Sequence, residues 1–495
     1  MQREKNSFLR LIAAAVFVLA CMTSMGTLAA PKYESSWDSL DQRPMPAWFQ
    51  DDKFGIFIHW GVYSVPSWAP KDNYAEWYWN SMGGMAVIKS GTTWDFHERT
   101  YGAGFQYHDF AHLFKTEMFD PNQWAEVFKN SGAKYVVLTS KHHDGYCLWP
   151  SEEANRSWGR PWNSVDIGPR RDLLGDLGNS VRAAGLRMGF YYSLYEWYNP
   201  LWLADKKTYI EKHMIPQFKN VVASYKPSII FSDGEWDLPS SEWKSEELLS
   251  WLYNDTPVGE EVVVNDRWGK ECRHVHGGYY TTEYTSGLES DHPWEENRGM
   301  GHSYGYNRNE ALNDYKTGRE LTLMLVDLVS RGGNLLLDIG PTADGRIPVI
   351  MEERLIQIGE WLKGNGEAIY GTRPWKQNRQ WSEGEIPKAN YGGQFMVKYD
   401  INDVIGNAKD GKAVIEAFFT AKESDLYAIT PRWPGEKLIL KGVKAAANST
   451  VQLLGAEEAL PWTAEGENLV IQVPQRYKGD VSTQNIYTFK ITNIQ

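Results

Sequence analysis

The chain has 495 residues and a formal net charge of −12, which disfavours nucleic acids and anionic membranes as partners. Its length predicts two domains. Aromatic residues make up 14% of the chain, with 23 Trp and 27 Tyr. These side chains combine a flat apolar face with one polar tip, so they favour a carbohydrate-binding surface, although part of them must belong to the core.

The first 30 residues have the features of an export signal. Arg3 and Lys5 form a basic start, residues 11–20 are wholly apolar, and small residues follow at 27–30. The apolar stretch is too short for a membrane span. We therefore predict a signal peptide over 1–30 and a periplasmic or secreted protein. An alternative is lipoprotein processing, in which Cys21 carries a lipid anchor.

Cysteine is rare, at positions 21, 147 and 272. Two cysteines in the mature chain do not make a disulfide framework. The sequence leaves open a single Cys147–Cys272 bridge and two free thiols.

Apolar strand-like runs alternate with amphipathic stretches between residues 50 and 345. This alternation indicates βαβ units and a parallel sheet. We predict a (β/α)8-like, TIM-type barrel, regular or irregular, with a doubly wound open sheet as the alternative. No Gly-rich phosphate fingerprint follows the first strand, which disfavours the open sheet. The expected strands are 54–58, 135–139, 188–192, 228–231, 261–264 and 334–338, with helices at 173–184, 211–225, 243–253, 321–330 and 351–362.

The pattern changes after Tyr370. Short apolar runs at 394–399, 413–419, 437–440 and 469–473 recur between Gly, Pro, Asn and Asp turns. This pattern of short apolar runs separated by turns predicts a C-terminal antiparallel β-sandwich. The expected domains are the signal peptide at 1–30, the barrel at 31–371 and the sandwich at 372–495.

A buried strand ends abruptly in Ser232-Asp233-Gly234-Glu235-Trp236. Active sites of α/β barrels lie at the C-terminal ends of the strands, so Asp233 should project into the mouth of the barrel. A carboxylate beside a tryptophan suits attack on the anomeric carbon of a sugar. The sequence therefore predicts a retaining glycosidase with Asp233 as its nucleophile.

Other polar residues follow predicted strands. His59, next to Trp60, ends the first strand, and His142 and His143 follow the second. Adjacent histidines on an extended loop point in different directions and are poor ligands for one metal, so neutral imidazoles that bind hydroxyls fit better. Arg267 could hold a carboxylate ionised or pair with a neighbouring acid.

A glycosidase also needs a second carboxyl group as general acid and base. Four glutamates downstream of Asp233 are candidates, and residue spacing cannot measure how far each lies from it. The candidates are Glu283, Glu289, Glu295 and Glu296.

Taken together, these segments resemble glycoside hydrolase family 29, the α-L-fucosidases, across nearly the whole mature chain. Each segment alone is a weak signal, and their shared order makes the resemblance specific. The matching segments are 48–49, 55–61, 76–78, 141–145, 191–193, 232–236, 265–269, 294–295, 304–307 and 333–341.

The resemblance implies the barrel and sandwich, hydrolysis of terminal α-L-fucosyl residues of glycans with retention, and no cofactor or metal. It implies Asp233 as the nucleophile. In this family the acid/base comes from variable loops, so the resemblance does not assign it. We favour Glu283, because it closely follows the strand of Arg267, with Glu295 as the runner-up. Phe231 and Trp236 would contact the ring face and the methyl group at C6. The other expected substrate-binding residues are His59, Trp60, Glu76, Trp77, His142, His143, Arg267 and one tyrosine of the pair Tyr191 and Tyr192, of which we favour Tyr192.

Three alternatives stay open. A fucose-binding relative without activity needs the aromatic surface but not two reactive acids. A hydrolase of another sugar, such as a galactosidase of the same stereochemical series, would keep both acids. Metal-dependent hydrolysis through His142 and His143 would be lost in chelator.

Overall fold

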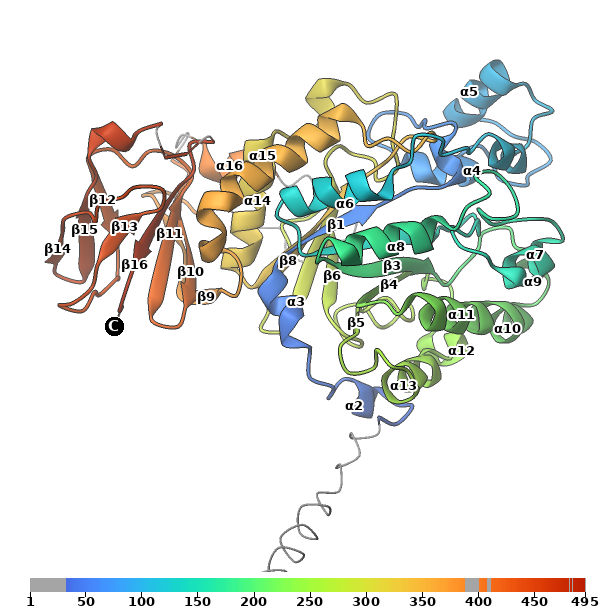
Figure 1. Cartoon of the computed structure of the whole chain (residues 1–495), viewed down its shortest axis with the longest axis horizontal. Coiled ribbons are helices and arrows are strands. Elements are labelled where there is room, and N and C mark those ends of the chain that lie inside the picture. Colours follow the sequence, from blue (N-terminus) through green and yellow to red (C-terminus); the bar gives the residue numbers. More distant parts are fainter. Residues whose placement is uncertain (1–32, 388–399, 407–410, 480, 483, 495) are drawn as a thin grey trace, which may run out of the picture.

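The computed structural model describes residues 33–387, 400–406, 411–479, 481–482 and 484–494. Its larger part is an eight-stranded parallel sheet with the strand order β5-β4-β3-β2-β1-β8-β7-β6 (Figure 1). The strands are β1 Phe54–Ile58, β2 Tyr135–Lys141, β3 Arg187–Ser193, β4 Ile229–Asp233, β5 Val263–Val264, β6 Tyr280–Glu283, β7 Trp294–Gly299 and β8 Gly333–Ile339.

The strands have two buried faces, because one faces the barrel interior and the other faces the helices. Every residue of β2 and β8 is buried, which accounts for their nearly continuous apolar sequences. Side chains alternate between these faces. Phe57, Tyr191 and Phe231 belong to the inner cluster, whereas Ile58 and Tyr192 belong to the outer one.

The strands β5 and β6 stand at the two ends of this strand order. The segment that precedes β6 connects them by hydrogen bonds to β5 and the residue after it. The amides of Gly278 and Tyr279 donate to the carbonyls of Asn265 and Val264 at 3.2 and 3.0 Å, and Asn265 and Tyr279 form an isolated parallel bridge. The sheet therefore curls into a (β/α)8-like barrel, as predicted, and the open doubly wound sheet is wrong.

Helices cover the outside of the barrel irregularly. In the fully described stretch from β5 to β7, no helix connects β5 to β6 or β6 to β7. The helices of this part are α2 Trp37–Leu40, α3 Ala47–Asp52, α4 Tyr78–Ser81, α5 Thr92–Tyr101, α6 Pro121–Asn130, α7 Glu152–Trp158, α8 Leu173–Ala183, α9 Pro200–Ala204, α10 Lys206–Tyr209, α11 Ile215–Tyr225, α12 Ser240–Trp243, α13 Ser245–Asp255, α14 Gly318–Ser330 and α15 Val349–Asn365.

Local sequence sets several helix starts. Asp120 accepts hydrogen bonds from the amides of Asn122 and Gln123 at the start of α6. Thr317 and Glu320 form a capping box at the start of α14. Both devices satisfy amides that have no partner within the helix.

The C-terminal part consists of two antiparallel sheets, as predicted, and lies beside α14 and α15 (Figure 1). The predicted strand at 394–399 lies outside the described residues. The sheets have the orders β13-β16-β11-β10-β9 and β12-β15-β14. The elements are β9 Arg373–Trp381, α16 Asn402–Ile405, β10 Ile415–Lys422, β11 Asp425–Thr430, β12 Lys437–Leu440, β13 Val451–Leu453, β14 Trp462–Glu465, β15 Asn468–Gln472 and β16 Tyr487–Ile491.

Polar contacts join this part to the barrel. The Arg379 guanidinium of β9 donates to Asp327 of α14, with 2.8 Å between Nε and Oδ1. The Trp361 indole of α15 donates to the Ile486 carbonyl at 3.2 Å. These contacts fix the sandwich against two consecutive barrel helices, at a distance from the mouth of the barrel.

The two cysteines among the described residues, Cys147 and Cys272, are buried free thiols. The structure therefore agrees with two thiols and contradicts the Cys147–Cys272 bridge. The predicted signal peptide and Cys21 lie outside the described residues. Within those residues, no helix combines the length and apolar character needed to cross a membrane.

Candidate active site

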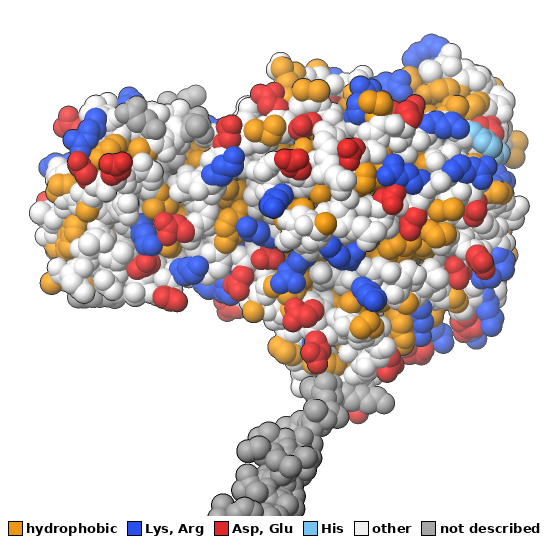
Figure 2. Space-filling view, in the orientation of Figure 1, with side chains coloured by type: hydrophobic (Ala, Val, Ile, Leu, Met, Phe, Trp, Pro, Cys, Tyr) orange, Lys and Arg blue, Asp and Glu red, His pale blue; other side chains and the backbone are white. Residues whose placement is uncertain are grey.

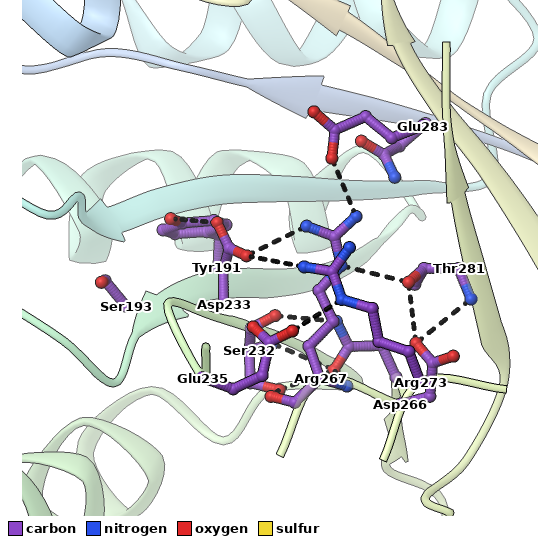
Figure 3. A network of polar contacts seen from close by, with 12 residues as sticks. Tyr191, Ser193, Ser232, Asp233, Glu235, Asp266, Arg267, Arg273, Thr281 and Glu283 are labelled. Atoms are coloured by element: carbon purple, nitrogen blue, oxygen red, sulfur yellow. Dashed lines mark hydrogen bonds and ion pairs between the residues drawn. The ribbon is translucent and has the colours of Figure 1, made fainter. Parts of the chain in front are cut away.

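Asp233 is the last residue of β4 and points into the mouth of the barrel (Figure 3). Gly234 follows it with φ +74, a conformation that ends the strand and that side chains other than glycine adopt with strain. The Asp233 carboxylate accepts hydrogen bonds from Arg267 Nη1 at 3.0 Å and Tyr191 Oη at 2.9 Å. His143 Nε2 lies 3.5 Å from its Oδ2. A buried carboxylate is thus held in place by three neighbours.

These neighbours control the charge of Asp233. Burial alone would raise the pKa of this carboxyl, but the charges of Arg267, His143 and Arg273 and the Tyr191 hydrogen bond outweigh it and lower the pKa to about 2. Asp233 is therefore ionised across the neutral and mildly acidic range. That is the state a nucleophile needs.

Arg267 joins Asp233 to a second carboxylate. Its Nη2 donates to Glu283 Oε2 at 3.1 Å, and its Nε donates to Thr281 Oγ1 at 3.1 Å. Tyr74 Oη donates to the other Glu283 oxygen at 3.1 Å. One guanidinium therefore holds two carboxylates, at the C-terminal ends of β4 and β6 (Figure 3).

A second arginine approaches the same oxygen of Asp233 as Arg267 does. Arg273 Nη2 is 3.8 Å from Asp233 Oδ1, and Arg273 Nε donates to Glu235 Oε1 at 2.6 Å. Burial raises the pKa of Glu235, against the lowering effect of Arg273. The loop after β4 thus supplies an acid that orients Arg273 toward the nucleophile.

The three predicted histidines are buried and neutral at pH 7. Burial lowers the pKa of His59 to about 3 and that of His143 to about 4, and it lowers the pKa of His142 well below the usual range. His59 Nδ1 lies 2.6 Å from Asp338 Oδ1, and His143 Nδ1 lies 2.6 Å from Ser193 Oγ. These partners orient the rings, and each neutral ring offers one donor and one acceptor.

Glu76 is also buried and accepts a hydrogen bond of 2.8 Å from the Gly305 amide. Burial raises its pKa to about 8, although the hydrogen bonds from Gly305 and Ser303 act in the opposite direction. Glu76 is therefore mostly protonated at neutral pH and can donate a hydrogen bond as well as accept one.

Aromatic rings form the wall of the pocket. The Trp77 ring lies 5.0 Å from Trp197 and 5.9 Å from Trp236 between centroids. The Phe231 ring also belongs to the lining, and the Arg267 guanidinium lies over it, 4.9 Å from its centroid. The pocket is lined by Phe57, His59, Tyr74, Glu76, Trp77, His142, His143, Tyr191, Phe231, Asp233, Trp236, Arg267, Glu283, Asn297 and Tyr304.

Tyr192 was predicted in the site, and this prediction is wrong. Its hydroxyl donates to Gln217 Oε1 at 2.9 Å and to the Met214 carbonyl at 3.1 Å, among the outer helices. Tyr191 lies in the pocket instead. Because strand side chains alternate and Asp233 pairs with Ser193 in the parallel register, Tyr191 shares the inner face with both.

Trp60 was also wrongly placed in the pocket. It follows His59 and so faces outward, where its indole donates to the Thr342 carbonyl at 2.9 Å. Its ring packs 4.9 Å from Trp124 and 5.2 Å from Phe114. Trp60 therefore supports the strand that carries His59 and belongs to the core.

The runner-up acid/base, Glu295, is outside the pocket. In the parallel register Glu295 pairs with Thr281 and Asn297 pairs with Glu283. Glu295 thus lies two residues deeper in the barrel than Glu283, about 7 Å along the strand direction. There the Tyr135 hydroxyl donates a hydrogen bond to the Glu295 carboxyl group. Glu296 faces outward and accepts from the Thr285 amide, and Glu289 is exposed.

Sequence reasoning missed several residues of the site. Phe57, Tyr74, Asn297 and Tyr304 line the pocket without having been assigned a role. Alternation along the strands could have found Phe57, two residues before His59. Tyr74 comes from a loop with no periodicity, so no local signal pointed to it.

No group of three or more His, Cys, Asp or Glu side chains in the described part of the chain is arranged to hold a metal ion. The His142 and His143 rings lie 4.2 Å apart between centroids with planes tilted by 55°. His143 is hydrogen-bonded to Ser193, so the two rings face different neighbours.

A parallel barrel with two carboxylates at its C-terminal mouth and a wall of tryptophans is typical of glycoside hydrolases. Comparison with known proteins narrows this class. Residues 20–367 match the model of the Alpha-L-fucosidase family, and residues 412–492 match that of the Alpha-L-fucosidase C-terminal domain.

Similar proteins span almost the whole chain. Tissue alpha-L-fucosidase of Homo sapiens is 40% identical over 475 residues, covering 94% of this chain and 92% of that protein. Alpha-L-fucosidase of Dictyostelium discoideum is 38% identical over 497 residues, covering 97% and 99%. The crystal structure of Thermotoga maritima alpha-fucosidase with a mechanism-based inhibitor matches with a TM-score of 0.75 and 36% identity, covering 93% of this chain and 100% of that one. The chain belongs to the α-L-fucosidases of glycoside hydrolase family 29, as its motifs predicted.

Proposed function

We propose that this protein is a retaining, exo-acting α-L-fucosidase that hydrolyses terminal α-L-fucosyl residues of oligosaccharides or glycoconjugates. The observation that carries this proposal is the bridge from Arg267 to both Asp233 and Glu283 in a pocket walled by tryptophans. Family membership supports the same activity.

In the first step, an oxygen of Asp233 attacks the anomeric carbon of fucose. The bond to the glycosidic oxygen breaks, and Glu283 gives its proton to that oxygen. Arg267 and Tyr191 orient the attacking carboxylate. The product is a fucosyl ester on Asp233, with inverted configuration.

In the second step, Glu283 accepts a proton from water, and the water oxygen attacks the anomeric carbon. The ester bond breaks, and Asp233 returns as a carboxylate. Asp233 loses its negative charge when it becomes an ester. Of the two acids that Arg267 contacts, Glu283 is then the one that can still form an ion pair with it.

The remaining lining residues bind the sugar. Neutral His59, His142 and His143 exchange hydrogen bonds with ring hydroxyls, and Glu76 contributes a further donor or acceptor. Phe231 and Trp236 contact the methyl group at C6 and the apolar face of the ring. The lining residues surround Asp233 in one compact pocket, and this arrangement fits a terminal sugar residue.

The test is hydrolysis of an aryl α-L-fucoside followed by proton NMR of the released sugar. Initial release of α-L-fucose would support the proposal, and initial β-L-fucose would replace it with an inverting mechanism. Absence of release together with binding to fucosylated glycans on an array would identify a fucose-binding relative without activity.

Azide distinguishes the two carboxylates. Glu283→Ala should lose activity on substrates with poor leaving groups. On an activated aryl α-L-fucoside, whose leaving group needs no proton, sodium azide should restore turnover by attacking the fucosyl ester and give α-L-fucosyl azide. Asp233→Gly with azide should give β-L-fucosyl azide, because azide then attacks the substrate directly. Glu295→Ala is the matched control, and azide rescue of this variant instead would reverse the assignment of the acid/base.

We also propose that residues 1–30 direct export to the periplasm or the medium. The basic start, the short apolar stretch and the small residues at 27–30 support this. The N-terminal residue of the mature protein, determined by mass spectrometry, tests it. A lipid-modified Cys21 would favour the lipoprotein alternative.

A further inference from the structure

A second pocket, of about 260 Å³, is formed by loops and short helices that follow β1, β2 and β3. Trp79 of α4, Trp158 of α7 and Pro200 of α9 contribute to its lining. It shares no lining residue with the catalytic pocket. Its volume is slightly below the range of about 300–1,000 Å³ for drug-sized ligands and is enough for a sugar ring.

The floor of this second pocket is aromatic. The Trp79 ring stacks on Tyr107 with centroids 4.6 Å apart and planes at 8°, and it lies 4.7 Å from Tyr198 and 5.8 Å from Trp158. Gly84 approaches so closely that a Cβ there would lie 2.0 Å from Tyr198 Oη. A packed aromatic floor of this kind offers a rigid flat surface to the apolar face of a sugar.

The ionisable side chains of the lining, apart from its tyrosines, are basic. Lys89, His108 and Arg160 line the pocket, and no Asp or Glu does. Arg160 is exposed, and within the described part of the chain neither Arg160 nor Lys89 forms an ion pair. His108 has an acidic neighbour, with its Nε2 3.6 Å from Asp109 Oδ1. In a protein with a net charge of −12, two cations without acidic partners beside one pocket favour a negatively charged ligand.

A wall of aromatic side chains separates the two pockets. Trp77 lines the catalytic pocket and packs 5.0 Å from Trp197, whose neighbour Tyr198 lines the second pocket. Figure 2 shows Lys and Arg side chains at the end of the molecule that carries α4, α5 and α7. A glycan bound in the second pocket would thus lie next to the catalytic pocket without entering it.

We propose that the second pocket is a carbohydrate-binding site for a sugar that carries a negative charge, either a carboxylate or a sulfate ester. The ring lies on the floor of Trp79 and Tyr198, and the anionic group pairs with Arg160 and Lys89. Binding at this site requires no hydrolysis.

Ligand-observed NMR titrations of the full-length mature protein test the proposal with sugars that contain no fucose. The probes are 3′-sialyllactose, lactose 3′-sulfate and neutral lactose, with excess free L-fucose to occupy the catalytic pocket. We expect saturable binding of at least one charged sugar, at least roughly tenfold tighter than lactose and weakened by salt. Equal affinity for lactose, or no saturable binding of either charged sugar, would overturn the proposal.

Two variants and one control locate the site. Arg160→Ala and Lys89→Ala should each weaken binding of the charged sugar by roughly tenfold. Arg156→Ala removes the same charge from an exposed position on α7 that does not line the pocket, so it should bind as the wild type does. Unchanged binding by both pocket variants would show that the sugar binds elsewhere. Because the probes contain no fucose, this result is independent of the aryl fucoside assay.

Discussion

The Tyr191 hydroxyl donates a hydrogen bond of 2.9 Å to Oδ2 of Asp233. Burial and the nearby negative charge of Asp233 raise the pKa of Tyr191 well above its ordinary value, so the phenol stays protonated and remains a donor. Tyr191 and Tyr192 have different hydrogen-bond partners, because their side chains lie on opposite faces of β3.

This difference gives a matched pair of substitutions. Tyr191→Phe should lower kcat/KM on an aryl α-L-fucoside by about 10- to 100-fold, because a hydrogen bond to a charged group contributes about 1.5–3 kcal/mol. Tyr192→Phe should leave kcat/KM within about twofold and lower the free energy of unfolding by about 1 kcal/mol. Steady-state kinetics and urea unfolding provide both readouts. The reverse pattern would return Tyr192 to the site.

Removal of Arg273 should change the pH dependence of activity. Arg273 helps to lower the pKa of Asp233 to about 2, so Arg273→Ala should raise that pKa and move the acid limb of kcat/KM upward by about one pH unit or more. Arg273→Lys keeps the charge and should move the limb less. An acid limb at the same pH in wild type and Arg273→Ala would show that Arg267 alone sets the charge of Asp233.

Glu295 should affect stability rather than catalysis. Burial raises its pKa from 4.5 to about 8. Such a group stabilises the folded state fully below pH 4.5, and this contribution is lost as the pH rises through about 8. It amounts to about 4 kcal/mol over that range. Glu295→Gln cannot titrate, so its free energy of unfolding, relative to the wild type, should rise between pH 4 and pH 8. Parallel stability curves over this range would contradict the assignment of Glu295 to a buried, protonated site.

Phe231 should contribute to sugar specificity. A methyl group in an apolar pocket is worth about 1–3 kcal/mol, and Phe231 is a buried aromatic part of the lining. Phe231→Ala should lower the ratio of kcat/KM on aryl α-L-fucoside to that on aryl β-D-galactoside by about tenfold or more. Phe231→Leu, which keeps an apolar side chain, should lower it less. A wild-type preference for the galactoside would favour the alternative specificity.

Much of the barrel was predictable because its strands are continuous apolar runs. Five of the six expected strands fall within one or two residues of β1, β2, β3, β4 and β8, and the expected run at 261–264 contains the short β5. The strands β6 and β7 were missed because Tyr280–Glu283 and Trp294–Gly299 are rich in polar residues. Their polar side chains are hydrogen-bonded inside the protein, as in the bond from Thr282 to Glu296, so burial leaves no hydrophobic pattern.

The position of Asp233 was predictable for a different reason. It ends an apolar strand, and the direction of that strand in a barrel fixes which end carries the site. The choice of Tyr192 over Tyr191 failed because the motif gives no side-chain direction. Counting back two residues at a time from Ser193, which pairs with Asp233, would have selected Tyr191.

The junction between β5 and β6 has a consequence for the site. Besides two backbone hydrogen bonds, side chains cross it: Thr281 Oγ1 donates to Asp266 at 2.7 Å, and Arg267 reaches Thr281 and Glu283 (Figure 3). The nucleophile and Arg267 belong to one edge of the sheet, and Glu283 belongs to the other. A sugar that contacts both carboxylates therefore also bridges the junction between β5 and β6. This junction has the fewest backbone hydrogen bonds of the barrel. Part of its binding free energy should then appear as slower amide exchange along β5 and β6, including residues that the sugar does not contact.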